Sequence, residues 1–466
     1  MLFNSFEFVV FLALVLPLYY ALAWRWQNRM LVVASYAFYA SWNWHFVSLL
    51  AISTIVDFWC ARFIDRSSDP ATRRRWLLVT LCLNLGFLGI FKYFGFFVDS
   101  FAELMKVFGV TASLPVLEVV LPVGISFYTF QSISYSIDVY YRRTRPTTDF
   151  LAFALYVSYF PHLVAGPIQR STHLLPQLQA PRRVDRLKVA TATQLILMGY
   201  FKKVFIADGV APWVDHAFAQ PQALGAPELW MSLYLFAIQI YGDFAGYTDI
   251  ARGVSRLLGV ELTLNFRQPY LASDITDFWR RWHIALSSFL RDYLYIPLGG
   301  TRRGTLLTYR NLMLTMLLGG LWHGASWTFV VWGGLHGLYL AMHRLMTRER
   351  TASRVGPGHA LKILATFHLV CVAWVFFRAD SLEVAWAYLS GLVVNWHTAP
   401  SPLAVTLAFY GLLTLLVDLP CWWNDRETPV DESWPAWSRG LAYATMIVLI
   451  SFIGEPNARP FIYFQF

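Results

Sequence analysis

Long apolar runs, separated by short polar and basic connections, recur along the whole chain. A helix that crosses a bilayer needs about 20 mainly apolar residues. Residues 30–63 are long enough for two such helices, with a turn near Asn43 and His45. The pattern therefore predicts an all-α, polytopic membrane protein with about 11 spanning helices. Single spans are expected at 5–24, 76–98, 118–141, 190–211, 229–250, 361–377, 401–420 and 437–454, and 311–345 is long enough for two.

Two of the apolar runs contain residues that interrupt helices. We expect 311–345 to break into two passes at Gly319 and Gly320. The run 151–167 is short for a span and contains Pro161 and Pro167. Irregular backbone persists at membrane depth only where protein or a water-filled cavity surrounds it, so this run is predicted to be re-entrant or tilted.

Segment 273–300 is too charged to cross lipid by itself. Ser273 or Asp274 can cap a helix at its start, and Asp277 precedes Arg281 by four residues, the spacing of an ion pair within a helix. We predict an amphipathic helix at the membrane interface or along a protein-enclosed cavity. Its aromatic residues share one side, and Pro and Gly residues end it: Phe278, Trp282, Phe289, Tyr293, Pro297, Gly299 and Gly300.

The composition supports this interpretation. Of the 466 residues, 57% are hydrophobic and only 14% are charged, whereas soluble proteins carry about 25% charged residues. We therefore expect a single membrane domain over 1–466 rather than several soluble domains. The four cysteines are far apart and suggest buried apolar side chains rather than disulfides.

The net charge of +9 comes from basic residues in the connections between apolar runs. Under the positive-inside rule, the loops 61–75, 170–188 and 344–354 are predicted to be cytoplasmic. The first helix is expected to be uncleaved, with its N-terminus outside and Arg25 and Arg29 inside. No basic, aromatic-interleaved module stands outside the apolar runs, so nucleic-acid binding is not expected.

His323 places an ionisable group in the middle of the apolar stretch 311–345. Such groups are costly in a membrane and usually face a cavity or the interior of a helix bundle. An imidazole can take a proton from a hydroxyl and return it later, and burial favours its neutral form. A histidine that hydrogen-bonds neighbouring helices explains the residues equally well.

Further polar residues in unusual places are candidates with two interpretations each. His283, with Ser287 four residues on, contacts either a substrate or a neighbouring loop. The charged residues of 273–300 either bind the phosphates of a donor or form a solvated ion-pair face; they are Asp277, Arg280, Arg281, Arg291 and Asp292.

The carboxylates Asp243 and Asp249 either have a structural role, through hydrogen bonds or pairing with Arg252 or Arg256, or line a funnel. His162 is expected to be structural. His336 and His343 are seven residues apart without a placed carboxylate, so no metal site is predicted. No GxSxG motif indicates a serine nucleophile.

Two long motifs resemble the membrane-bound O-acyltransferase (MBOAT) family, and within it the AlgI branch of bacterial alginate O-acetyltransferases. They are WRRWHIALSSFLRDYLYIPLGG (279–300) and LWHGASWTFVVWGGLHG (321–337). Shorter segments support the resemblance, which covers nearly the whole chain: LPVGISFYTFQ (121–131), FPHLVAGPI (160–168), GDFAGYTD (242–249) and PFIYFQF (460–466).

The resemblance implies a ring of helices around a thinned centre, with a funnel from each membrane face. It also implies that His323 is the catalytic histidine and His283 the second histidine of the active site. Ala285 and Phe289 stand where the family is expected to have Ser and Trp, which are mild departures. Candidates for contacting substrates, beside this pair, are Trp322, Asp277, Arg280, Arg281, Ser287 and Asp243.

The resemblance further implies an enzyme of the bacterial inner membrane that moves an acetyl group to an exported polysaccharide, with alginate first and cellulose or peptidoglycan as alternatives. Acetyl-CoA is the expected cytoplasmic donor, no cofactor is expected to be bound, and periplasmic proteins are expected to complete the transfer. A transporter or flippase for a lipid-linked saccharide, or a scaffold subunit of an export complex, would also explain the intramembrane charges. Transporters often contain internal repeats, and the chain shows none.

Overall fold

The computed structural model describes residues 1–110, 120–302, 304–346, 357–396, 401–431, 433–454 and 459–462. Throughout these residues the secondary structure is helical, with turns and irregular connections and no strand. The prediction of an all-α protein is therefore confirmed for the part described. The beginning of the expected span 118–141, most of the expected loop 344–354 and the last four residues of the motif at 460–466 lie outside it.

The chain divides into two compact units, of which unit 1 comprises Met1–Ala192 and Ala251–Thr263. Unit 2 comprises Thr193–Ile250 and Leu264–Phe466. Helix α10 (Arg186–Tyr200) and helix α12 (Ala226–Leu257) contribute to both units. The other helices of unit 1 are α1 (Phe6–Ala21), α2 (Trp24–Ala40), η1 (Trp44–Phe46), α3 (Val47–Arg66), α4 (Pro70–Leu88), η2 (Gly89–Tyr93), α5 (Phe94–Val107), α6 (Ile125–Tyr140), α7 (Phe150–Ser158), α8 (Phe160–Leu163) and α9 (Ser171–Leu178).

Unit 2 carries the remaining helices, which include several short ones between the long apolar ones. They are η3 (Phe201–Ala207), α11 (Asp208–Ala219), η4 (Pro221–Ala223), η5 (Pro269–Leu271), α13 (Ile275–Arg281), α14 (Ile284–Leu290), η6 (Arg291–Tyr295), α15 (Thr305–His323), α16 (Trp327–Met346), α17 (Pro357–Arg378), α18 (Leu382–Val394), α19 (Leu403–Asn424), α20 (Ala436–Val448) and η7 (Leu449–Ile453).

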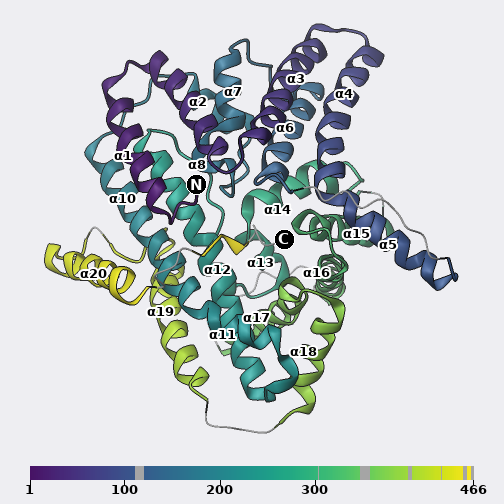
Figure 1. Ribbon diagram of the computed structural model, residues 1–466, viewed down its shortest axis with the longest axis vertical. Coiled ribbons are helices and arrows are strands. Elements are labelled where there is room, and N and C mark those ends of the chain that lie inside the picture. The colour runs from purple at the N-terminus through teal and green to yellow at the C-terminus, as the bar shows by residue number, and fades with distance from the viewer. Residues whose placement is uncertain are drawn as a thin grey trace. The chain divides into compact units, whose positions relative to one another are not determined.

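In unit 1, helices α3, α4 and α6 lie side by side (Figure 1). Helix α4 begins where the sequence offers a good N-terminus, because the Asp69 carboxylate accepts hydrogen bonds from the backbone N–H groups of Ala71 and Thr72. Between the helices, the buried Asp57 accepts two hydrogen bonds from Asn84, at 3.0 and 3.1 Å. Neutral donors thus satisfy a carboxylate in the interior of the unit.

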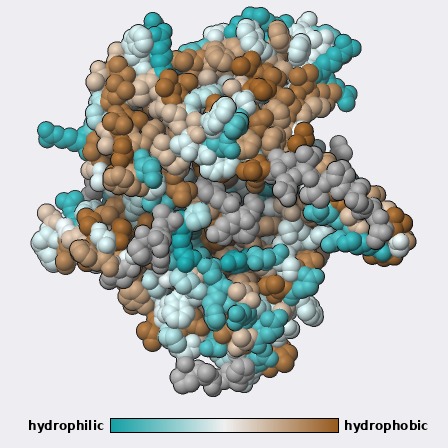
Figure 2. All heavy atoms as spheres, viewed as in Figure 1, coloured by the Kyte–Doolittle hydropathy of each residue, from teal (hydrophilic) through white to brown (hydrophobic). Residues whose placement is uncertain are grey.

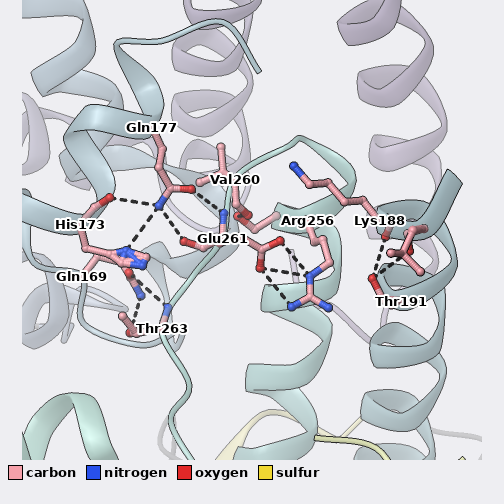
Figure 3. A network of polar contacts seen from close by, with 11 residues as sticks. Gln169, His173, Gln177, Lys188, Thr191, Arg256, Val260, Glu261 and Thr263 are labelled. Carbon is pink, nitrogen blue, oxygen red and sulfur yellow. Dashed lines mark hydrogen bonds and ion pairs between the residues drawn. The ribbon is translucent and has the colours of Figure 1, made fainter. Parts of the chain in front are cut away.

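Two glutamine side chains fasten the segment after α12 to the region around α9 (Figure 3). Gln177 Nε2 donates to the backbone oxygen of Glu261 at 3.0 Å, and its Oε1 accepts from the Glu261 N–H at 2.8 Å. Gln169 Nε2 donates to Thr263 Oγ1 at 3.0 Å. Each amide therefore holds a loop that has no helical hydrogen bonds of its own.

The surface of the molecule is rich in apolar side chains (Figure 2). Such a surface is expected for a protein whose solvent is lipid. Among the described residues, five helices are long and apolar enough to cross a membrane: Trp44–Arg66, Pro70–Val107, Arg186–Ala219, Gly358–Arg378 and Leu403–Asn424. Shorter apolar helices occupy Phe6–Ala21, Leu382–Val394 and Ala436–Phe452. The membrane character is confirmed, while the number of about 11 spans stays a prediction.

Several predicted elements are confirmed. The turn expected near Asn43 and His45 separates α2 from α3, and Asn43 caps η1. The run 151–167 does not form a long helix, because α7 has nine residues and is followed by α8, with four. The run is therefore interrupted, as its two prolines suggested, while its re-entrant or tilted course in the membrane stays a prediction.

Two predictions about helix breaks are wrong. The run 311–345 breaks after His323, at Gly324, and not at Gly319 and Gly320, which lie inside α15. Segment 273–300 is not one amphipathic helix, because the chain leaves helical geometry between α13 and α14. Backbone hydrogen bonds from residues 265–267 hold the chain at the break between α13 and α14.

Candidate active site

His323 is the last residue of α15, which packs closely against α16 in unit 2. A Cβ on Gly320 would come within 2.2 Å of the backbone oxygen of Phe329, and one on Gly333 within 2.3 Å of that of Met316. Glycine at these two positions lets the helix backbones touch, as expected for helix pairs in membranes. The close packing fixes the end of α15, and with it the place of His323.

His283 lies at the break between α13 and α14, with φ at 44° and ψ at 55°. This left-handed conformation costs a residue with a side chain about 1–2 kcal/mol. The segment before η5 supplies the backbone partners at the break: Arg267 N–H donates to the Arg281 oxygen at 3.0 Å, and Ile284 N–H donates to the Asn265 oxygen at 2.9 Å. A distant stretch of chain therefore sets the conformation of His283.

The Asn265 side chain completes this connection. Its Oδ1 accepts a hydrogen bond from the Ala285 N–H at 3.2 Å and lies 3.1 Å from His283 Nδ1. Both side chains are fully buried. Burial lowers the pKa of His283 to about 3, so its imidazole is neutral at physiological pH.

The structure brings the two predicted catalytic histidines together. Their ring centroids are 6.4 Å apart, and only 4% of His323 and none of His283 is exposed. Trp322 lies beside both, with ring centroids 5.8 Å from His283 and 5.0 Å from His323. Phe244 contacts His283 at 4.7 Å, and Phe377 contacts His323 at 5.3 Å. An apolar, aromatic wall thus surrounds two imidazoles, a setting in which proton transfer is protected from bulk water.

Asp243 does not join the histidines but forms a buried ion pair. Its carboxylate lies 2.5 Å from Lys203 Nζ and accepts a hydrogen bond from the Ile462 N–H at 2.9 Å. Lys203 also contacts Asp208 at 2.7 Å. These contacts favour the structural interpretation of Asp243 and attach the described end of the chain to α12.

Asp249 also has a lysine partner, because Lys202 Nζ donates to its carboxylate at 2.8 Å. Arg256, one of the two arginines considered as a partner of these carboxylates, pairs with Glu261 at 3.0 Å. His162, in unit 1, is 2.9 Å from Gln131 Oε1 through its Nε2 and is fully enclosed by protein, as expected of a structural histidine.

The charged residues of α13 lie at an open hollow of about 540 Å³. Asp277 and Arg281 form the expected ion pair at 2.9 Å, and Arg280 is exposed. Arg267 pairs with Asp425 at the same hollow. The lining combines these side chains with Gln268 and two indole rings, Trp422 and Trp423. Arginine and tryptophan together suit an anionic group joined to an aromatic ring.

Ser287 Oγ donates to the backbone oxygen of Trp282 at 3.1 Å and is half-buried. Because Trp282 lies at the break before α14, this hydrogen bond stabilises the conformation around His283. His343 and His336 point to different neighbours: His343 Nδ1 is 3.2 Å from Thr276 Oγ1, whereas His336 stacks on Phe278 with ring centroids 6.0 Å apart.

Sequence reasoning missed Asn265, Lys202 and Lys203. The two lysines had a visible signal, since they are adjacent charges within the apolar run 190–211, and intramembrane charges usually have partners. Asn265 lies in a connection between helices and had no such signal.

The fold and this site define a helical integral membrane protein with a buried pair of histidines. Comparisons with known proteins identify the family. Residues 140–386 match the membrane-bound O-acyltransferase family, MBOAT. The chain is 41% identical to the probable alginate O-acetylase AlgI of Pseudomonas putida over 100% of both chains. It is 45% identical to that of Pseudomonas aeruginosa, over 83% of this chain and 74% of the relative.

A peptidoglycan O-acetyltransferase of Helicobacter pylori is 39% identical over 78% of this chain and 73% of the relative. The chain therefore belongs to the membrane-bound O-acyltransferase family, and it is an O-acyltransferase of the membrane.

Proposed function

We propose that this protein transfers acetyl groups from cytoplasmic acetyl-CoA toward the hydroxyls of an exported polysaccharide, with alginate as the acceptor and the bacterial inner membrane as the location. The observation that carries the chemistry is the buried pair of His283 and His323, 6.4 Å apart between ring centroids. The acceptor is supported by the full-length similarity to a probable alginate O-acetylase. Peptidoglycan is the second candidate acceptor, because the Helicobacter pylori relative is named for it.

In the proposed reaction, the acceptor hydroxyl attacks the carbonyl carbon of the acetyl thioester. The new C–O bond forms, the C–S bond breaks, and the hydroxyl proton passes to His323 and then to the CoA thiolate. A positioned general base of this kind contributes on the order of 10²–10⁴ in rate. His283 orients one of the two substrates beside it.

We further propose that the hollow on α13 receives the phosphates of the donor. Arg280 is exposed there, and Trp422 and Trp423 offer faces on which an adenine can stack. Helix α13 also carries Phe278, whose ring packs against Trp282 at 5.7 Å on the buried side. One helix therefore connects a charged surface with the aromatic interior next to His283.

A histidine substitution in the native host tests the function. We expect a strain with His323→Ala and normal protein level to export polymer without acetate esters. His216→Ala is the matched control, because His216 is exposed at the end of α11, and its strain should acetylate normally. Wild-type ester content in the His323→Ala strain would refute the proposed chemistry.

The acceptor and the partner are tested separately. Ester analysis of both alginate and peptidoglycan in the same strains distinguishes the two acceptors. Because transfer outside the membrane is proposed to need periplasmic proteins, the purified enzyme should release CoA from labelled acetyl-CoA and acetylate polymer only when a periplasmic fraction is added. Full polymer acetylation by the enzyme alone would exclude an obligatory partner.

A further inference from the structure

The contacts of Asn265 determine which nitrogen of His283 carries the proton. The backbone N–H of Ala285 can only donate a hydrogen bond, so the Asn265 atom that it contacts at 3.2 Å is an oxygen. Amide orientations are often ambiguous, but here a backbone donor settles this one. The same Oδ1 lies 3.1 Å from His283 Nδ1.

An oxygen without a hydrogen can only accept, so His283 Nδ1 must be the nitrogen that carries the proton. The opposite orientation of Asn265 would turn its NH2 group toward both the Ala285 N–H and the ring. In that orientation the amide oxygen would take the present place of Nδ2. Nδ2 has no hydrogen-bond partner there among the residues that the structure describes, so no new hydrogen bond would compensate. A neutral imidazole has one protonated nitrogen, which leaves Nε2 as the acceptor.

We infer that Asn265 is a positioning residue that holds His283 in the tautomer with Nδ1 protonated. Its Nε2 then accepts a hydrogen bond from the acceptor molecule, beside the attacking hydroxyl whose proton passes to His323, and does not polarise the thioester carbonyl. This inference rests on the proposed acetyl transfer for its role, although the tautomer itself follows from geometry. It assigns the acceptor side of the reaction to His283.

The surrounding structure supports a fixed imidazole. His283 is held in left-handed geometry at the start of α14, and Asn265 also accepts the Ile284 N–H through its backbone oxygen at 2.9 Å. Phe244 stands edge-on to the ring at 4.7 Å. Backbone and side chain of one asparagine therefore orient both the residue and its ring.

Nitrogen NMR tests the tautomer without any assay of activity. In protein labelled with ¹⁵N-histidine at pH 7.5, the signals lost in His283→Gln identify His283. We expect its Nδ1 to be protonated and its Nε2 to be bare. A protonated Nε2 would overturn the inference, whether or not the enzyme accepts acetyl-CoA.

Kinetics test the role with two substitutions of similar size. Asn265→Leu removes the oxygen that accepts the hydrogen bond of His283 Nδ1, so a smaller fraction of the His283 rings has an unprotonated Nε2. The kcat with acetyl-CoA should therefore fall roughly 10- to 100-fold, with little change in KM for the donor. Asn265→Asp keeps the acceptor and should restore most of kcat. Its carboxylate also raises the pKa of the neighbouring imidazole, so the acid limb of the pH–rate profile should move to higher pH.

A merely structural asparagine would not move the pH profile. An unchanged acid limb in Asn265→Asp, together with wild-type kcat in Asn265→Leu, would refute the role. If Asn265→Leu does not fold, the Asp profile and the NMR assignment still decide the inference. Absence of acetyl-CoA turnover in the wild type would refute the proposed function instead, while the tautomer result would stand.

Discussion

At the scale of single residues, Lys203 shows how much depends on one buried charge. Its ammonium lies 2.5 Å from Asp243 and 2.7 Å from Asp208, and it is 2% exposed. Removing one partner leaves the opposite charges buried and unpaired, which costs about 3–5 kcal/mol. We expect Lys203→Met to lower the Tm in detergent strongly, whereas Lys362→Met, at an exposed position of α17, should leave it unchanged. Equal Tm values for both variants would show that the buried pairs add nothing.

His283 predicts a pH dependence of stability. Its pKa is lowered by burial to about 3 in the folded protein, against about 6.5 in an unfolded chain. Between about pH 3 and about pH 6.5, the unfolded chain binds a proton at residue 283 that the folded protein does not bind. The contribution of His283 to the free energy of unfolding is therefore fully present above about pH 6.5 and declines as the pH falls toward about 3. His283→Gln should therefore lose less Tm between pH 7 and pH 5 than the wild type does. An equal loss of Tm in the two proteins would contradict the lowered pKa of His283.

Arg280 tests the donor hollow. We expect Arg280→Gln to raise the KM for acetyl-CoA roughly 5-fold, since an exposed ionic contact is worth up to about 1 kcal/mol. The KM for S-acetylpantetheine, which lacks the phosphates, should not change. Arg310→Gln, at an exposed position of α15 outside the hollow, is the control for charge alone. A rise in KM for both donors would show that Arg280 acts on something other than phosphate.

Residues with chemistry of their own could be predicted from the sequence, and residues that act through others could not. His323 is predicted by its motif and by the cost of an imidazole in an apolar run, and His283 is predicted by its motif. The structure places them together. Asn265 acts through a contact across 18 positions of sequence, and a polar residue in a connection is ordinary. Only the folded arrangement reveals its partner.

At the scale of elements, two neighbouring glycines of α16 differ sharply. A Cβ on Gly333 would lie 2.3 Å from the backbone oxygen of Met316, whereas one on Gly334 meets only the end of a leucine side chain at 3.6 Å. We expect Gly333→Ala to push α15 and α16 apart, to destabilise the protein by about 1–3 kcal/mol and to lower acyl transfer by displacing His323. Gly334→Ala should keep both Tm and activity. Normal activity in Gly333→Ala would show that the close packing does not position the histidine.

Close helix packing through glycine also explains why one helix break was predicted in the wrong place. Gly319 and Gly320 look like an interruption, but glycine within membrane helices often serves close packing, and the chain turns only at Gly324. The break before α14 was missed because its backbone partners come from residues 265–267. Hydrophobic pattern predicts where helices exist, as at α1, α2 and α3, because burial in lipid is local. Tertiary hydrogen bonds, which decide the interruptions, are not local.

At the scale of the whole molecule, the proposed reaction needs a defined orientation in the membrane. The proposed donor comes from the cytoplasm, the side on which the basic connections are expected. Helix α1 leads to Arg25, α2 returns to the turn around Trp44, and α3 leads to the arginine-rich connection 61–75. The positive-inside rule then predicts Trp44 outside and Ser68 inside.

Cysteine labelling in spheroplasts decides this orientation. Trp44 and Ser68 are both exposed, and Cys82 is the exposed native cysteine, while Cys60, Cys371 and Cys421 are buried. In a Cys82→Ala background, we expect a membrane-impermeant maleimide to label Trp44→Cys in spheroplasts and to label Ser68→Cys only after the membrane is opened. Labelling of Ser68→Cys alone from outside would mean the inverse orientation. The basic connections would then face away from the source of acetyl-CoA, and the proposed direction of transfer would have to be abandoned even with both histidines intact.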